Sequence, residues 1–205
     1  MSGLFISFEG IDGVGKSTQA DLLEAWLTEQ NKEVIRTLEP GGTDVGIEIR
    51  KILLHHKGDL APRAEAALFA ADRAHHVASK IRPALEQGKI VITDRYFDSS
   101  VAYQGAGRDL SRTEVRDLSL WAVGGLLPNL TVLLDLPAGE ARARRNSSGT
   151  EPDRLEKEKT EFFETVRSAY LDLAKAEPDR FLVVDASVSV EAMQSVIRER
   201  VAGLI

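Results

Sequence analysis

The chain has 205 residues, of which 43% are hydrophobic and 28% are charged, a composition that suits one compact domain with a sizeable core. Its net charge of −6 does not suggest a nucleic-acid or anionic-membrane partner, so any phosphate must be bound by a local basic site. The lack of cysteine excludes disulfides and thiolate metal sites, and no apolar stretch approaches the roughly 18 residues that span a bilayer. We therefore expect a cytoplasmic protein with no membrane and no nucleic-acid partner.

Short apolar runs alternate with longer helical patterns along the chain. The expected strands are Leu4–Glu9, Glu33–Leu38, Lys89–Asp94, Leu130–Leu136 and Arg180–Asp185. Nearly continuous apolar cores such as FISF and TVLL are typical of parallel strands covered on both faces. The expected helices are Thr18–Asn31, Asp44–His55, Ala64–Lys80, Ser111–Val123, Ala138–Arg145, Leu155–Ala176 and Ser189–Val201. This alternation predicts a single α/β domain over residues 1–205, a three-layer sandwich with a five-stranded parallel sheet flanked by helices.

A phosphate-binding sequence follows the first strand. Residues 10–17 read G-I-D-G-V-G-K-S and match the pattern G-x-x-x-x-G-K-[ST] between an apolar strand and an amphipathic helix. Glycines let several backbone N–H groups point at one phosphate, and the helix that begins at Lys16 adds its positive end. Lys16 should reach the β- and γ-phosphates of ATP, and the Ser17 hydroxyl should ligate Mg²⁺. The full set expected to bind ATP is Gly10, Ile11, Asp12, Gly13, Val14, Gly15, Lys16, Ser17, Thr18 and Arg142.

The loop by itself does not separate a hydrolase, a GTPase switch and a small-molecule kinase, although the sequence lacks the N-K-x-D motif of Ras-type GTPases. Asp94 and Arg95 end the third strand, at the edge where open α/β sheets bind ligands. Asp94 is expected to hold the Mg²⁺ shell, and Arg95 to grip a second, acceptor phosphate. Asp12 lies inside the loop and needs a nearby counter-charge, either Mg²⁺ or an arginine.

Arginines flank a stretch that contains Ser, Gly and Pro, at residues 146–152. This composition predicts a mobile loop, and we interpret the segment of about residues 142–154 as a lid. Such a lid would close over the transferring phosphates and supply charge to the transition state. The candidates are Arg142, Arg144, Arg145 and Arg154, among which the sequence does not decide. A solvated basic helix end is the alternative.

Together these motifs resemble those of bacterial thymidylate kinases along nearly the whole chain. The matching stretches are FEGIDGVGKST, EPGGT, FAADR, DRYFDSSVAYQG, PDRLE and VVDAS, in the order and spacing of the family. The resemblance implies transfer of the γ-phosphoryl group of ATP to dTMP, giving dTDP and ADP, by a Mg²⁺-dependent homodimer. A lid rich in arginine, beside a phosphate loop without one, is similar to the lid-arginine type of the family.

The resemblance also implies how the base and sugar of dTMP are bound. Phe69 would stack on the thymine ring, an interaction of about 1–3 kcal/mol for a base on an aromatic side chain. Arg73 would hydrogen-bond the base edge, and Ser99 or Ser100 would complete base recognition. Tyr103 would pack against the deoxyribose and disfavour a 2′-hydroxyl.

Further roles follow from the resemblance on the phosphate side. Gln104 would contact the nucleoside, Arg95 would bind the dTMP phosphate, and Asp12 would help position that phosphate and the sugar hydroxyl. Catalysis is expected from Lys16, Asp12, Arg95, Arg144, Arg145 and Arg154. Leu38 departs from the family, whose members often have arginine before E-P-G-G-T. The acceptor-side contact of that arginine must be absent or supplied elsewhere.

Other functions stay open at this point. A different nucleotide kinase would act on UMP, CMP or a deoxynucleoside, and a nucleotide-dependent switch or regulatory ATPase would hydrolyse ATP in a partner-dependent way. A non-enzymatic binding module would leave Asp94, Arg95 and the lid unexplained.

Two minor features are expected to be structural. The pairs His55–His56 and His75–His76 should lie at the surface or in a groove, since adjacent helical residues point in different directions. Trp26 and Trp121 should be packing residues.

Overall fold

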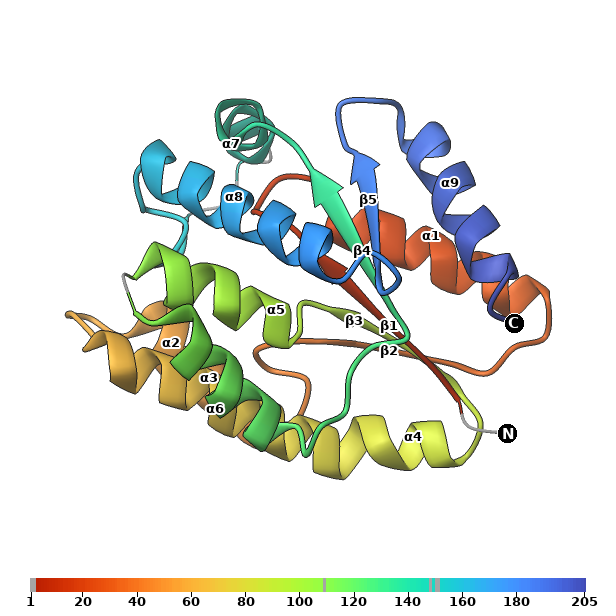
Figure 1. The fold of residues 1–205 in the computed structure, drawn as a ribbon, viewed down its shortest axis with the longest axis horizontal. Coiled ribbons are helices and arrows are strands. Elements are labelled where there is room, and N and C mark those ends of the chain that lie inside the picture. The colour runs from red at the N-terminus through yellow and green to blue at the C-terminus, as the bar shows by residue number, and fades with distance from the viewer. Residues whose placement is uncertain (1–2, 109, 148, 150–151) are drawn as a thin grey trace.

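A five-stranded parallel sheet forms the centre of the molecule (Figure 1). The structure is a computed structural model that describes residues 3–108, 110–147, 149 and 152–205. In these ranges the strands are β1 (Leu4–Glu9), β2 (Val34–Leu38), β3 (Ile90–Asp94), β4 (Leu130–Asp135) and β5 (Phe181–Asp185). Their order is β2-β3-β1-β4-β5, with β1 paired to both β3 and β4. The fold predicted from the sequence is confirmed, with strand ends within one residue of expectation.

Helices cover both faces of this sheet. On one face α1 packs on β1, β2 and β3, beside α9 on β5; on the other, α8 packs on β4 and β5 and α4 on β3. The helices are α1 (Lys16–Glu29), α2 (Asp44–His55), α3 (Pro62–His76), α4 (Arg82–Glu86), α5 (Phe97–Ser100), α6 (Arg112–Ala122), α7 (Ala138–Ser147), α8 (Thr160–Ala176) and α9 (Val190–Ala202). Two π-helical segments, η1 (Val77–Ile81) and η2 (Val101–Gly107), continue α3 and α5.

The helical prediction was wrong in three places. Helix α4, over Arg82–Glu86, was not expected, because the predicted helix ended at Lys80. Residues 97–107 were not expected to be helical, because the sequence DSSVAYQG has no amphipathic period of 3.6 residues. Helix α8 begins at Thr160 rather than at Leu155, because the residues before it form a separate turn closed by Asp153. Within the expected lid, Ser148, Thr150 and Glu151 lie outside the described residues.

The apolar core forms on both sides of β1. Ile6 and Phe8 are fully buried in one cluster with Leu23 and Leu27 of α1, whereas Phe5 belongs to a second cluster. Complete burial of each such side chain contributes about 1.5–3 kcal/mol. The core therefore fixes β1 and the start of α1, which carry the phosphate loop between them.

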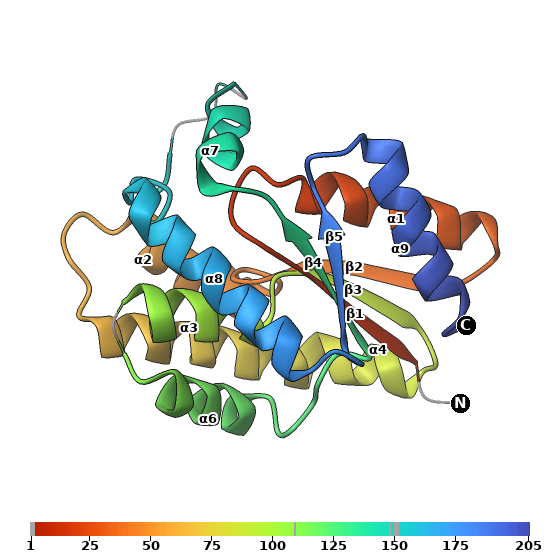
Figure 2. The ribbon, with the colours of Figure 1, turned by 45° about the horizontal axis from the view of Figure 1, so that its top comes forward.

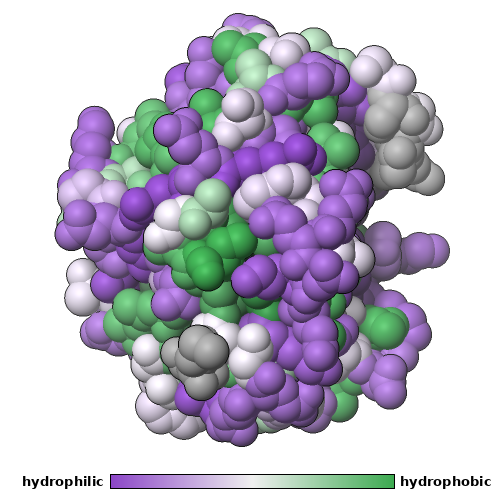
Figure 3. Space-filling model, turned by 90° about the vertical axis from the view of Figure 1, so that its right-hand side faces the viewer, coloured by the Kyte–Doolittle hydropathy of each residue, from purple (hydrophilic) through white to green (hydrophobic). Residues whose placement is uncertain are grey.

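The start of β1 and the end of α9 lie at the same end of the molecule, away from the carboxyl ends of the strands (Figure 2). Seen from that side, the surface is mainly hydrophilic, with hydrophobic residues in separate patches (Figure 3). No helix in the described part of the chain is long and apolar enough to cross a membrane.

Two expectations about single residues were wrong. Trp121 is 80% exposed on α6, whereas Trp26 packs on the core as expected. His76 is fully buried, with Nε2 at 2.7 Å from Thr37 Oγ1 and Nδ1 at 2.9 Å from Glu39 Oε1. Its burial follows from its place on the inner face of α3. Within the described ranges, no group of three or more His, Cys, Asp or Glu residues is arranged to hold a metal ion.

Candidate active site

The phosphate loop is shaped by its glycines. Gly15 adopts φ 96° and precedes α1, and Gly13 adopts φ 89° at a place where a Cβ atom would lie 2.2 Å from the Ala141 carbonyl oxygen. Both positions therefore require glycine. The Lys16 side chain is buried and folds back over the loop, where Nζ donates to the carbonyls of Gly10 at 3.1 Å and Ile11 at 2.9 Å. The ammonium group thus lies within the loop that would receive the phosphates.

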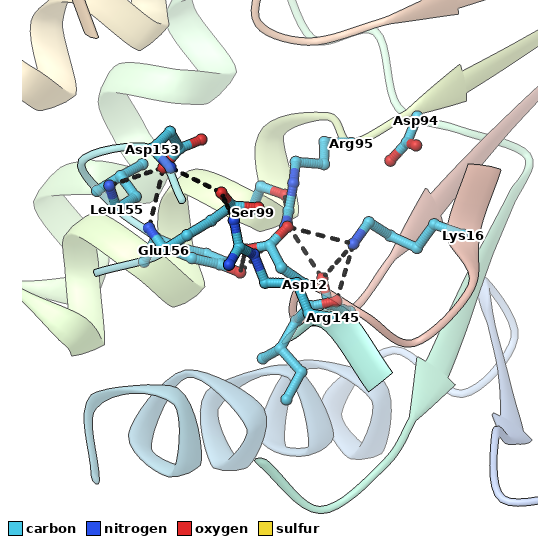
Figure 4. A network of polar contacts seen from close by, with 12 residues as sticks. Asp12, Lys16, Asp94, Arg95, Ser99, Arg145, Asp153, Leu155 and Glu156 are labelled. Atoms are coloured by element: carbon cyan, nitrogen blue, oxygen red, sulfur yellow. Dashed lines mark hydrogen bonds and ion pairs between the residues drawn. The ribbon is translucent and has the colours of Figure 1, made fainter. Parts of the chain in front are cut away.

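Asp12 pairs with Arg95 across the sheet edge (Figure 4). Arg95 Nη2 donates to Asp12 Oδ1 at 2.6 Å, and Lys16 Nζ lies 3.9 Å from the same oxygen. Burial opposes ionisation of Asp12, but the charges of Arg95 and Lys16 outweigh it and lower the pKa of Asp12 to about 2. The counter-charge that the sequence required for Asp12 is therefore an arginine, assisted by Lys16.

Arg95 has an unusual backbone. Its φ of 68° is left-handed, which costs a non-glycine residue about 1–2 kcal/mol. Three hydrogen bonds hold this turn: Arg95 N–H donates to Phe8 O, Tyr96 N–H to a Glu9 carboxylate oxygen, and Thr93 Oγ1 to Arg95 O. The strained turn directs the guanidinium back over the phosphate loop, where Nη1 donates to Gly10 O at 3.1 Å.

One cavity, of about 140 Å³, brings together the eight residues expected to bind the acceptor. Helix α3 contributes two of them, and α5 and η2 contribute four more from a segment about 30 residues further along the chain. The lining residues from the expected set are Asp12, Phe69, Arg73, Arg95, Ser99, Ser100, Tyr103 and Gln104. The roles of these residues stay predictions. The cavity is also lined by residues outside the expected set, namely Glu39, Pro40, Arg50, Leu54, Asp153, Leu155 and Glu156.

Arg73 is held rigidly at the inner end of this cavity. Its Nε donates to Glu39 at 2.6 Å, Nη1 to Ser100 Oγ at 3.1 Å and Nη2 to Tyr96 O at 3.1 Å. These bonds use three of the five N–H groups of a guanidinium. The guanidinium has two further N–H groups, and Arg73 lines the cavity together with Phe69.

A second cavity, of about 440 Å³, lies over the phosphate loop. Its lining includes Gly13, Gly15, Lys16, Ser17, Thr18, Leu38, Asp94, Arg144 and Arg145. It shares Asp12, Glu39, Arg50, Arg95 and Glu156 with the first cavity. Because the two cavities have a common wall at Asp12 and Arg95, a phosphate in one would face a phosphate in the other.

Four residues of the expected ATP set do not line the cavity over the loop. Ile11 and Arg142 face a neighbouring cavity between α7 and α8, and Arg142 donates to Thr160 Oγ1 at 2.9 Å. The Val14 side chain is buried in the core, and Gly10 lies behind Arg95.

Ser17 and Asp94 form a pair of oxygen donors suited to Mg²⁺. Ser17 Oγ donates to Asp94 Oδ2 at 2.7 Å at the mouth of the phosphate loop. Mg²⁺ prefers hard oxygen ligands and is usually held by one or two protein groups together with phosphates and water. The two side chains therefore fit the ion that the motif implies.

The expected lid arginines are not brought to one place. Arg144 and Arg145 line the cavity over the loop, with Arg144 Nη1 donating to Ala186 O at 2.7 Å and Arg145 Nη2 paired with Glu156 at 2.5 Å. Arg154 lines neither substrate cavity and is bound instead to Glu65 and Leu53 O. For Arg154 to meet a transferring phosphate, its guanidinium would have to leave Glu65.

Comparisons with known proteins match this arrangement over the whole chain. The family model "Thymidylate kinase" matches residues 8–197. The chain belongs to the thymidylate kinase family. A thymidylate kinase of Leifsonia xyli is 64% identical over 203 residues, covering 99% of this chain and 96% of the relative. One of Clavibacter sepedonicus is 61% identical, covering 100% of this chain and 97% of the relative.

A solved member of the family shares the fold. The crystal structure of thymidylate kinase from Ehrlichia chaffeensis matches with a TM-score of 0.81 at 31% identity, covering 98% of this chain and 99% of that one.

Leu38 occupies the position where the family resemblance led us to expect arginine. Its side chain is 41% exposed and lines the cavity over the phosphate loop. Arg50 of α2 lines both cavities, and its Nη1 donates to Pro40 O at 2.7 Å. The guanidinium of Arg50 therefore brings a positive charge to the shared wall from α2 instead of from position 38 of β2.

Sequence reasoning missed several buried acids and a tyrosine that hold the site. Glu39 binds Arg73 and His76, Glu65 binds Gln104, Arg108 and Arg154, and both are almost fully buried. Glu39 stands in E-P-G-G-T and could have been suspected from that motif. No local signal marks Glu65 or Tyr170, because their side-chain partners lie at least 39 residues away along the chain.

Proposed function

We propose that this chain transfers the γ-phosphoryl group of ATP to dTMP, forming dTDP and ADP. The observation that carries this proposal is the common wall of the two cavities, where Asp12 and Arg95 lie between the phosphate loop and the pocket of Phe69 and Arg73. Membership of the thymidylate kinase family supports dTMP as the acceptor.

In this proposal the acceptor pocket binds the thymine base and the deoxyribose of dTMP. Phe69 stacks on the thymine ring, and the two remaining N–H groups of Arg73 bind the base edge. Ser100 and Ser99 lie beside them, already bonded to Arg73 and Arg95. Tyr103, whose hydroxyl bonds both Asp12 and Arg95, places its ring against the sugar, with buried Gln104 next to it.

Charge stabilisation does most of the catalytic work. A phosphate oxygen is already nucleophilic near neutral pH, so alignment and charge matter more than a general base. Lys16 and Arg95 hold the donor and acceptor phosphates, and Arg144 and Arg145 add positive charge from the lid side of the same cavity. Mg²⁺, held by Ser17 and Asp94, would neutralise phosphate charge when bound. Closure of the lid excludes water, which would otherwise turn the kinase into an ATPase.

The test is ATP turnover with Mg²⁺ against dTMP, dUMP, UMP, dCMP, dGMP and no acceptor. We expect a strong preference for dTMP, with dTDP as the product and little hydrolysis without acceptor. Preference for another monophosphate would support a kinase but would contradict the assignment of the pocket to thymine. Rapid hydrolysis that does not depend on an acceptor would favour a switch or ATPase.

A cytoplasmic homodimer is also part of this proposal. A mainly apolar groove between α3 and α6 is lined by Ala66, Leu110, Val115 and Leu118, with the charged Arg63 and Glu114 also in its lining. Trp121 is exposed on α6. An exposed tryptophan beside an apolar groove is typical of a protein–protein contact. A second copy of this chain would cover it.

A further inference from the structure

Glu9, the last residue of β1, is completely buried directly below the active site. It lines neither substrate cavity, so it does not meet a ligand itself. Burial, followed by the charge of Asp98, raises the pKa of Glu9 to about 7. Burying a carboxyl group costs folding free energy unless hydrogen bonds compensate for the lost water. The partners of Glu9 are therefore the place to look for its role.

The two oxygens of Glu9 reach Arg95 by separate routes. Oε1 accepts the N–H of Tyr96 at 2.8 Å and so fixes the left-handed turn of Arg95. Oε2 accepts the hydroxyls of Ser99 at 2.6 Å and Tyr170 at 2.8 Å. Arg95 Nη1 in turn donates to those hydroxyls, at 3.2 Å to Ser99 and 3.4 Å to Tyr170.

Tyr170 comes from α8, far along the chain from β1 and β3. Its hydroxyl lies within hydrogen-bonding distance of Glu9, Ser99 and Arg95, and its side chain is almost completely buried. Helix α8 and the carboxyl ends of β1 and β3 therefore come together at the carboxylate of Glu9. Glu9 thus supports both the backbone and the guanidinium of Arg95 from below, in addition to the direct hydrogen bonds that Arg95 makes to Phe8 O, Gly10 O and Asp12.

We propose that Glu9, together with the hydroxyl of Tyr170, is a positioning residue that aims Arg95 at the acceptor phosphate. This inference rests on the proposed function, because Arg95 is taken to bind the phosphate of dTMP. It assigns to Glu9 and Tyr170 an effect on acceptor binding, separate from ATP binding by the phosphate loop.

Two conservative variants separate positioning from stability. Glu9→Gln keeps an oxygen for the Tyr96 N–H but replaces the oxygen that accepts from Ser99 and Tyr170. Tyr170→Phe removes the hydroxyl and keeps the ring. Ser7→Ala is the matched control, since Ser7 is buried on the same strand and face. It loses a 3.0 Å hydrogen bond to Thr131, whose hydroxyl is bonded to Arg180 and not to Arg95.

Steady-state kinetics with each substrate varied, together with urea unfolding, tests the proposal. Glu9→Gln and Tyr170→Phe should raise KM for dTMP about tenfold, with KM for ATP changed less than twofold. Ser7→Ala should change neither KM, even if it unfolds at lower urea. Parallel increases in both KM values, equal effects in Ser7→Ala, or unchanged values in both test variants would overturn the proposal. Failure of the proposed function is distinguishable, since the unmodified protein would then not phosphorylate dTMP.

Discussion

At the scale of single residues, the site is built around one ionised carboxylate between two cations. Asp12 lies 2.6 Å from Arg95 and 3.9 Å from Lys16, and so holds both cations at the shared wall of the cavities. Burial and the charge of Arg95 lower the pKa of Lys16, and Asp12 partly offsets them. The bound phosphates would replace Asp12 as partners of these cations.

Replacing Lys16 tests whether this cation acts on the transferring group. Lys16→Ala should lower kcat by at least a hundredfold, because charge stabilisation supplies most of the catalysis in phosphoryl transfer. Steady-state kinetics gives kcat, and circular dichroism with thermal unfolding checks that the fold is kept. Turnover close to that of the unmodified protein would contradict the assignment.

Leu38 and Arg50, which line the same cavity, give a second prediction. Arg50→Ala should raise KM for dTMP about tenfold, because Arg50 is the cation of α2 at the shared wall. Leu38→Arg should lower that KM and should weaken the effect of Arg50→Ala in the double variant. Leu38→Met is the neutral control. Additive effects in the double variant would show that the two positions do not substitute for one another.

At the scale of elements, a buried charged cluster joins α3 to the segment after β2. Glu39 pairs with Arg73 and His76, while Asp72 Oδ1 accepts the N–H of Gly41 at 3.1 Å. Asp72 is completely buried, and its Oδ2 has no hydrogen-bond partner among the described residues. Burial, and then the charge of Glu39, raises the pKa of Asp72 to about 6.

Asp72 should therefore make stability depend on pH. Its folded-state pKa is raised from 3.8 to about 6, so between these values the folded protein binds more protons than the unfolded chain. Its contribution is present below about pH 4 and is lost as pH rises through 6, at up to about 1.4 kcal/mol per pH unit. Asp72→Asn should make this slope shallower in urea unfolding at pH 4.5, 5.5 and 7, and the part due to Glu9, whose pKa is also raised, should remain. The exposed Asp117→Asn is the control, and parallel curves for Asp72→Asn and the parent would refute the prediction.

Elements and motifs were predictable from sequence to different degrees. The strands and the phosphate loop carry local signals, namely continuous apolar runs and glycines at fixed spacing. Residues 97–107 do not, since their helical form depends on packing against α6 and α8. The same reason explains why Tyr170 was missed, since its contacts come from distant parts of the chain. Glu9 stands in the quoted stretch FEGIDGVGKST, but the motif does not show that its carboxylate contacts Tyr96, Ser99 and Tyr170.

At the scale of the whole molecule, the exposed face of α3 and α6 predicts self-association. Trp121→Lys should shift the protein from dimer to monomer in sedimentation velocity at micromolar concentration, because it places a charge in an apolar contact. Val196→Lys on α9, also at an exposed apolar position, should leave the dimer intact. A dimer that persists in Trp121→Lys would contradict the prediction that the face of α3 and α6 is the dimer interface.

The π-helical form of η2 bears on how the chain can vary in length. In a π-helix each hydrogen bond spans one residue more than in an α-helix. Deleting one residue from Val101–Gly107 would therefore favour an ordinary α-helix and change the direction in which the following residues point. Arg108, now paired with Glu65 and Glu158, would then point elsewhere. Among relatives, this stretch should exchange residue types while keeping its residue count, and gaps should fall instead in the connection that leads to α6.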